Sequence, residues 1–325
     1  MSSAGASIVK YTDEVWPETD RFWTTVLGPD WNDEARSRWR WMNARRSHFL
    51  SVQEGRVLGN ATLLRQPFVT PTGEKLDVGW ITDFYVSTEL KGQGIGKRLA
   101  RRLEEDVEVV ATFGQSDEAR HCFHSVGWTG LDWTPLLGVT LPGLRRHDVD
   151  TRAFTRIPLD SPAFDEVWNR RGATSLCVGA RDTAALGERL LGRPDANYEA
   201  WTTDSGDGIQ GWVLLRMIRG GRNRRFGRVP TGLIVDLLAV DGADDVLARL
   251  ASFGAWRLGR LGAVMVLAVD TASPTGESLS RAGFRPSLGV GPLRVRRLPQ
   301  KGFMQSRATP PFHLTFLDCD AELTF

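Results

Sequence analysis

Three glycines, Gly92, Gly94 and Gly96, stand where a strand could give way to a helix, and such a turn can bind a phosphate. Residues 80–86 form an apolar run rich in β-branched and aromatic side chains, which is typical of a strand. Residues 95–103 then carry apolar side chains at helical spacing among Lys and Arg. The start of a helix leaves backbone N–H groups unpaired, and the helix dipole favours an anion there. The stretch therefore predicts a phosphate site.

The spacing of these glycines excludes two common phosphate loops, the Walker loop and the GxGxxG dinucleotide loop. Residues 86–96, VSTELKGQGIG, instead resemble the acetyl-CoA loop of the GCN5-related N-acetyltransferase (GNAT) superfamily. That loop reads Arg/Gln-x-x-Gly-x-Gly/Ala after a strand ending in Val-x-Pro. This sequence has Thr88 where proline is common and Lys91 where Arg or Gln is common, and Lys91 keeps the positive charge.

A second segment, residues 116–128, resembles the other CoA motif of the superfamily, Asn-x-x-Ala-x-x-Phe-Tyr-x-x-x-Gly-Phe. The spacing of Ala119, Phe123, Gly127 and Trp128 matches it. Because both motifs occur at the right separation, the N-terminal part of the chain is identified as a member of this superfamily. The resemblance implies that acetyl-CoA is a co-substrate whose thioester an amine attacks directly.

The resemblance also implies which residues hold acetyl-CoA. Backbone groups of Phe84, Tyr85 and Val86 would hold the pantetheine and polarise the acetyl carbonyl, and Phe123 of the second motif would lie at the same site. The pyrophosphate would be held by the loop and the first helical turn, through Lys91, Gly92, Gln93, Gly94, Ile95, Gly96, Lys97 and Arg98.

Asp83 lies in the strand just before the loop, where a carboxylate could remove a proton from the attacking amine, directly or through water. The alternative is a structural hydrogen bond beside the strand. That alternative is supported by Asp236, which occupies the matching position in a second copy of the pattern described below.

The general acid is less well defined, because the superfamily often has Tyr at the position of Phe123, and Phe cannot donate a proton. His124 or Cys122 could take this role, although each lies on a different helical face from Phe123. Solvent could also protonate the leaving thiolate. His121 and His124 have no third ligand nearby in the sequence, so we expect no metal.

The composition describes an ordinary soluble protein. The chain has 325 residues, of which 41% are hydrophobic and 25% charged, and this length accommodates two domains of roughly 150 residues each. A net charge of +2 gives no reason to expect nucleic acid as a partner. The three cysteines form no zinc pattern or disulfide framework, which favours a reducing cytoplasm. The N-terminus lacks an apolar leader and no run approaches a membrane span, so we expect no membrane association.

In the first half we expect a strand at 7–12, two amphipathic helices at 14–26 and 32–46, and a hairpin of strands at 48–53 and 56–66. A short strand at 107–112 and a helix at 116–126 follow the basic helix. The first two helices and their connection carry five of the twelve tryptophans and one phenylalanine. These rings could either pack the helices onto a sheet or line an acceptor pocket, and they are Trp16, Phe22, Trp23, Trp31, Trp39 and Trp41.

The order of elements repeats after a polar, turn-rich linker at 142–150. Asp83 matches Asp236, and Gly127-Trp128 matches Gly283-Phe284, at separations of 44 and 47 residues. This supports an internal duplication. We therefore predict an α/β fold of two tandem GNAT-like domains, at 1–145 and 151–325, each a mixed, largely antiparallel sheet flanked by helices.

The second copy has lost the phosphate loop. Residues 241–245 read DGADD, and three carboxylates beside a helix start would repel a pyrophosphate. We interpret this half as structural or substrate-shaping, as in tandem members of the superfamily that the chain resembles loosely. At its end, Asp318 and Asp320 either bind a cationic acceptor or simply close a polar strand.

The leading hypothesis is an acyl-CoA-dependent N-acyltransferase, with acetyl as the donor by family prevalence. It would act on the amine of a small molecule such as an amino sugar or natural product, as a monomer or homodimer. One alternative is a CoA-binding regulatory or scaffold protein without turnover, which Phe123 and the second copy keep open. Another is a protein or peptide N-acetyltransferase, which needs an open acceptor groove. Thiol release with a panel of amines separates an enzyme from a binder.

Overall fold

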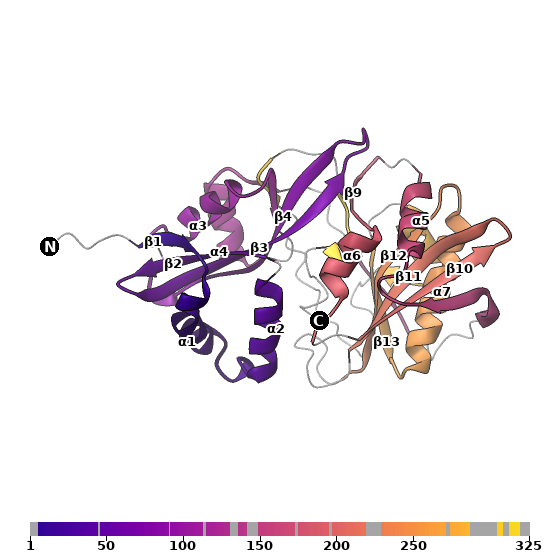
Figure 1. The fold of residues 1–325 in the computed structure, drawn as a ribbon, viewed down its shortest axis with the longest axis horizontal. Coiled ribbons are helices and arrows are strands. Elements are labelled where there is room, and N and C mark those ends of the chain that lie inside the picture. The colour runs from indigo at the N-terminus through magenta and orange to yellow at the C-terminus, as the bar shows by residue number, and fades with distance from the viewer. Residues whose placement is uncertain are drawn as a thin grey trace.

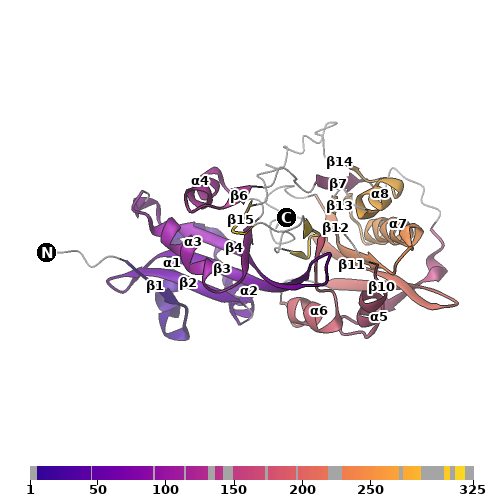
Figure 2. The same cartoon turned by 90° about the horizontal axis from the view of Figure 1, so that it is seen from above.

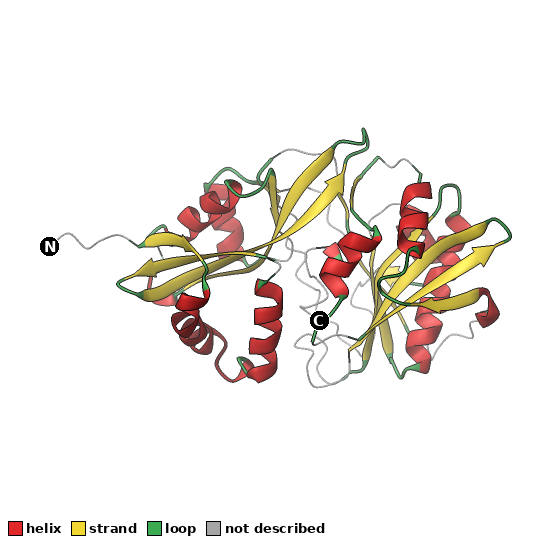
Figure 3. Cartoon of the chain, viewed as in Figure 1, coloured by secondary structure: helices red, strands yellow, loops and turns green. Residues whose placement is uncertain are grey.

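The computed structural model describes two mixed sheets, each flanked by helices (Figure 1 and Figure 3). The described residues are 6–44, 46–90, 92–112, 115–130, 136–141, 149–172, 175–194, 197–218, 229–270, 274–286, 304–307 and 312–318. The two-sheet architecture confirms the predicted α/β fold class.

The first sheet has the strand order β1-β2-β3-β4-β5-β15-β6, and a short strand, β9, pairs with β3 outside this order. Along the main order, only β4 and β5 are parallel. The bounds are β1 Ser7–Lys10, β2 Ser47–Gln53, β3 Arg56–Val69, β4 Lys75–Val86, β5 Val109–Thr112, β6 Thr129–Gly130, β9 Cys177–Gly179 and β15 Met304–Gln305.

Four helices cover the two faces of this sheet, at α1 Trp16–Leu27, α2 Asp33–Asn43, α3 Ile95–Glu104 and α4 Asp117–Ser125. On one face, α1 and α2 pack through a buried cluster that includes Trp23 and Trp39. On the other face, α3 and α4 pack through Leu99 and Phe123, and Figure 2 shows both above the sheet. The Asn32 side chain accepts a hydrogen bond from the Ala35 N–H, which confirms the predicted cap of α2.

The second sheet repeats the arrangement in the order β8-β10-β11-β12-β13-β7-β14, again with one parallel pair, β12 and β13. Its strands are β7 Leu136–Thr140, β8 Phe154–Ile157, β10 Tyr198–Ser205, β11 Gly208–Ile218, β12 Thr231–Ala239, β13 Met265–Asp270 and β14 Arg285–Pro286. Its helices are α5 Ala163–Arg170, α6 Thr183–Leu190, α7 Asp244–Arg260 and α8 Pro274–Arg281. The shared strand order, with a parallel pair at the same place, supports the internal duplication inferred from the sequence.

Strands cross between the two halves in both directions. β7, which precedes the linker in the sequence, lies between β13 and β14 of the second sheet. β15, from the end of the chain, takes the same place in the first sheet, between β5 and β6. The predicted division into two domains, at 1–145 and 151–325, therefore stays a prediction. Most of the linker between them, residues 142–148, lies outside the described residues.

The predicted element boundaries shift by a few residues. The helix expected at 32–46 ends at Asn43, because the next strand, β2, begins at Ser47. The central strand begins at Lys75 instead of 80, since its polar first residues pair with the end of β3. The last predicted strand is reduced to β16, Phe312–His313, which pairs with β9, and Asp320 lies outside the described residues.

Candidate active site

A fork between β4 and β5 forms the centre of the candidate site. The two strands are paired only from Val78 to Trp80, whereas β4 continues to Val86. Beyond this pairing, the register of β4 against β3 shifts by one residue between Ala61 and Leu63. Such a bulge bends the strand and increases its twist. The last residues of β4 therefore keep their bonds to β3 while the edge on the β5 side is open among the described residues.

The backbone of β4 offers hydrogen-bonding groups at this open edge. The Ser87 N–H donates to the Leu58 carbonyl of β3 over 2.8 Å. Because backbone groups alternate along a strand, Val86 and Phe84 direct theirs toward the open edge, and Tyr85 directs its own toward β3. An extended ligand chain such as pantetheine could pair with this edge in the manner of an added strand.

The Tyr85 side chain lies on the face of the first sheet that α1 covers. Its ring is 41% exposed and meets Trp23 of α1 edge-on, with the ring centroids 5.2 Å apart. The predicted role of its backbone in holding CoA stays a prediction, and its ring faces the α1 side together with Asp83.

The turn before α3 has the geometry that its glycines predict. Gly92 and Gly94 have φ values of +84° and +75°, which side chains with a Cβ rarely adopt, and Gly94 caps α3. Gly96 is needed for a different reason, because a Cβ there would lie 3.1 Å from the Cys122 Sγ. Lys91 lies outside the described residues.

The first turn of α3 suits an anion. It contains no acidic residue, and helix geometry leaves the N–H groups of residues 94–97 without partners inside the helix. Lys97 and Gln93 are exposed beside this turn. The Arg98 guanidinium donates to the Ala6 carbonyl over 2.9 Å and so also ties the N-terminal strand to α3. The turn can hold a pyrophosphate through backbone N–H groups, with Lys97 adding charge.

Helix α4 supplies packing beneath this turn. Phe123 is 1% exposed, stacks on Trp128 at 4.5 Å and contacts Phe84 at 4.9 Å. Cys122 is partly buried against Gly96, and burial raises the pKa of its thiol while Lys97 opposes the rise. His124 is exposed. Because α4 and Asp83 belong to opposite faces of the first sheet, the structure does not bring His124 to Asp83.

Asp83 lies on the α2 face and remains 28% exposed. The Arg46 side chain is almost fully buried. Its Nη1 lies 3.9 Å from the Asp83 carboxylate and donates to the Thr82 hydroxyl over 2.8 Å. Burial raises the pKa of Asp83, and the charges of Arg46 and Arg38 oppose that rise. A partly exposed carboxylate with a raised pKa is well matched to removing a proton from an ammonium group.

A buried polar cluster beneath Asp83 was not anticipated from the sequence. The Asn60 amide donates to the Asp83 carbonyl over 3.0 Å and to the Thr62 hydroxyl over 3.2 Å. The Thr62 hydroxyl is also 3.0 Å from the His48 Nδ1. Burial lowers the pKa of His48 to about 3, so this ring is neutral at pH 7. The sequence does contain one sign of this cluster, because His48, Asn60 and Thr62 are polar residues at inward-facing positions of otherwise apolar strands.

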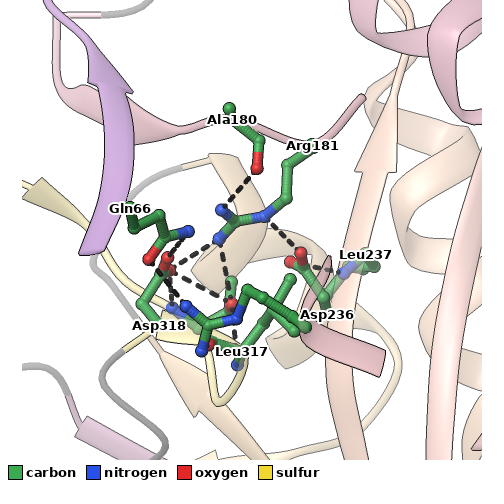
Figure 4. Close-up of polar contacts among 9 residues, drawn as sticks. Gln66, Ala180, Arg181, Asp236, Leu237, Leu317 and Asp318 are labelled. Atoms are coloured by element: carbon green, nitrogen blue, oxygen red, sulfur yellow. Dashed lines mark hydrogen bonds and ion pairs between the residues drawn. The ribbon is translucent and has the colours of Figure 1, made fainter. Parts of the chain in front are cut away.

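In the second sheet, the residue that matches Asp83 is used differently. Asp236 is 2% exposed and forms an ion pair with Arg181, which also binds Asp318 at 2.6 Å (Figure 4). Asp318, considered above as a site for a cationic acceptor, thus binds a cation of its own chain. The first turn of α7 carries Asp244 and Asp245, as the loss of the phosphate loop predicts.

The forked strands and the glycine turn at a helix start are the geometric features of the candidate site. Residues 12–127 match the model of the acetyltransferase (GNAT) family, so this segment has the features of a GNAT domain. The two-sheet fold as a whole is similar to that of a tandem GNAT protein. No protein of curated function matches the sequence.

Three solved structures illustrate the likeness. A probable N-acyltransferase from Enterococcus faecalis is 12% identical, with 92% of this chain and 72% of that chain covered and a TM-score of 0.63. A tandem GNAT protein from the clavulanic acid biosynthesis pathway is 11% identical, with 94% and 99% covered and a TM-score of 0.55. Saccharomyces cerevisiae N-myristoyltransferase with bound myristoyl-CoA is 10% identical, with 95% and 84% covered and a TM-score of 0.54. At these identities the likeness shows the fold alone.

The family supports acyl-CoA N-acyltransferase activity in general and does not distinguish small-molecule from protein acceptors. Among the described residues, no group of three or more His, Cys, Asp or Glu side chains could hold a metal ion. No helix in the described part of the chain is long and apolar enough to cross a membrane.

Proposed function

We propose that the chain is an N-acetyltransferase that moves the acetyl group of acetyl-CoA to the amine of a small molecule, such as an amino sugar or natural product. The observation that carries the proposal is the open edge of β4 beside the glycine turn of α3. One feature can pair with an extended pantetheine, and the other can hold its pyrophosphate.

Each residue of the site has a defined task in this proposal. The backbone of Phe84 and Val86 holds the pantetheine and polarises the acetyl carbonyl, which favours the developing oxyanion. Asp83 removes a proton from the acceptor ammonium, and Arg46 limits the rise in its pKa. The amine then attacks the carbonyl carbon, the C–S bond breaks, and the nitrogen releases its second proton to solvent. The thiolate takes a proton from solvent or from Cys122, which solvent then reprotonates.

The alternative without turnover is supported by one observation, the burial of Phe123 where the superfamily often has a tyrosine. Its ring lies in the core, stacked on Trp128, and it has no proton to donate. A protein or peptide acceptor remains the other alternative, because the family match does not restrict the acceptor.

Binding and turnover can be tested separately. Calorimetric titration with acetyl-CoA asks whether the fork and the turn bind the donor. Thiol release is then measured with a panel of amines, amino sugars and peptides, and with acetyl-CoA and myristoyl-CoA as donors. We expect binding and thiol release with at least one small amine. Binding without release across the panel would favour a non-catalytic protein, and release with peptides alone would favour a protein acceptor.

A further inference from the structure

In the second sheet, Asp236 is the residue that matches Asp83, and the space beside its carboxylate is filled by Arg181. Arg181 and Asp236 are 1% and 2% exposed, and the Arg181 Nε donates to the Asp236 carboxylate. At the equivalent place in the first sheet, Asp83 remains partly exposed. An amine therefore has no access to Asp236, and this carboxylate serves another purpose.

The Arg181 guanidinium joins the two halves of the molecule (Figure 4). Its Nη2 donates to Asp318 over 2.6 Å, and Asp318 accepts a second bond, over 2.8 Å, from the Gln66 amide of β3. Gly179 leaves room for these groups, since a Cβ there would lie 2.4 Å from both the Arg181 Nη1 and the Gln66 Nε2. Arg181 thus connects Asp236 of β12 with Asp318, which lies near the end of the chain. Asp318 is in turn bonded to Gln66 of the first sheet.

This network fixes both ends of α6. Arg181 directly precedes Asp182, whose carboxylate caps α6 by accepting from the Ala185 N–H over 2.8 Å. Near the other end, Arg189 donates to the side-chain Oε1 of Gln66 over 3.1 Å and to the backbone oxygen of Leu317. The position of α6 therefore depends on Gln66 of the first sheet and on Leu317, as well as on packing against the second sheet.

The residues that follow α6, Gly192 and Arg193, lie near Trp41 of α2, the helix just before Arg46. The Arg193 guanidinium is 5.9 Å from the Trp41 ring of α2, and a Cβ on Gly192 would be 3.7 Å from the Trp41 Nε1. The charges of Arg189 and Arg193 act on Arg46, which lies 3.9 Å from Asp83. A displacement of α6 would thus change both the packing of α2 and the charge around Asp83.

We propose that Arg181 is a positioning residue for the acceptor site of the first half. By joining Asp236 and Asp318, and Gln66 through Asp318, it holds α6 against α2, so the second half determines which amine reaches Asp83. The inference rests on the proposed function of that site. It gives the second copy a role in acceptor specificity in place of catalysis.

The test uses the full chain with Arg181→Met and, as a matched control, Arg257→Met, which removes another ion pair of the second half, with Glu199. We expect Arg181→Met to raise the KM for the acceptor about tenfold, with the affinity for acetyl-CoA unchanged. Amide hydrogen exchange should become faster in residues 183–193 and 33–46 and stay unchanged in α3 and α7. The control should show neither effect.

Arg181→Met leaves two buried carboxylates without their cation and could unfold the protein. Gly179→Ala is therefore the second variant, because it keeps every charge and displaces only the network. Gly206→Ala is its control, since a Cβ at that glycine meets nothing within 4 Å. Gly179→Ala should reproduce the change in acceptor KM and the local exchange pattern.

Two outcomes would overturn the inference. In one, acceptor KM and exchange of α2 stay at wild-type values in Gly179→Ala and in a folded Arg181→Met. In the other, exchange accelerates evenly through both halves, which indicates a purely structural role. If the wild-type chain acetylates no amine in the panel, the proposed function fails, while the exchange measurements still decide whether Arg181 positions α6 and α2.

Discussion

Arg46 lies 3.9 Å from the carboxylate of Asp83, whereas the matching carboxylate of the second sheet, Asp236, is closed off by Arg181. Arg46 lies between α2 and β2, and Arg181 lies just before α6, which leads into β10. Each arginine therefore precedes the second strand in the order of its sheet, β2 or β10. The difference is in exposure, 28% for Asp83 against 2% for Asp236. The same position can therefore serve proton transfer in one half and anchoring in the other.

Replacing Asp83 by Asn should lower kcat/KM for the acceptor about 100-fold, because the amide cannot take a proton. Acetyl-CoA affinity, measured by calorimetry, should not change. Asp77→Asn is the matched control, since Asp77 lies in the same strand and pairs with Arg65 at the surface. Normal turnover by the Asp83 variant would remove this residue from the reaction and leave it a structural role.

Arg46→Met should move the acid limb of the kcat/KM profile to higher pH, by roughly one unit. Arg46 opposes the raised pKa of Asp83, so its loss lets that pKa rise further, and a higher pH is needed to deprotonate the base. Arg46→Lys keeps the charge and should leave the limb close to its wild-type position. An acid limb that does not move in Arg46→Met would argue that another group titrates.

Gly94→Val should reduce affinity for acetyl-CoA at least about tenfold. A β-branched residue is strained at a φ of +75°, and its side chain would stand where the phosphates approach the backbone. Gly73→Val is the control, because Gly73 has a φ of +83° in the turn between β3 and β4, outside the α3 turn. Equal affinity of the Gly94 variant and wild type would refute the assignment of the turn.

His48 should make the fold sensitive to acid. Its pKa is lowered to about 3 in the fold and is about 6.5 when unfolded, so the unfolded chain binds the extra proton between these values. The stabilisation is complete above pH 6.5 and is lost as the pH falls through this window, by about 2 kcal/mol at pH 5.

Urea unfolding of wild type and His48→Gln at pH 7 and pH 5 measures this loss. The variant has no group that titrates at this position, so its free energy of unfolding should fall less between the two pH values. An equal fall in both proteins would assign the acid sensitivity to other groups.

Deleting residues 304–325 should destabilise the first half, although these residues are the last in the sequence. The deletion removes β15 from its place between β5 and β6, together with Met304, which is 0% exposed in the core under α3. We expect loss of cooperative thermal unfolding and of acetyl-CoA binding. A truncated chain that unfolds cooperatively and binds acetyl-CoA with wild-type affinity would show that β15 is dispensable.

The sequence by itself determined the features that depend on neighbours in the chain. The glycine turn was predictable because Gly92 and Gly94 adopt backbone angles that other residues avoid, and the cap at Asn32 because its side chain reaches an N–H three residues ahead. Strand and helix periodicity gave the order of elements, and the two matched motifs gave the family.

Only the tertiary structure decided the contacts between distant parts of the chain. Gln66 and Asp318, which are 252 positions apart, share a hydrogen bond, and β15 completes a sheet that begins at Ser7. Such pairings depend on how two sheets pack and on which buried charge finds a partner, and neither leaves a local pattern. The environment of Asp83 is set in the same way, because Arg46 and Asn60 reach it from other elements.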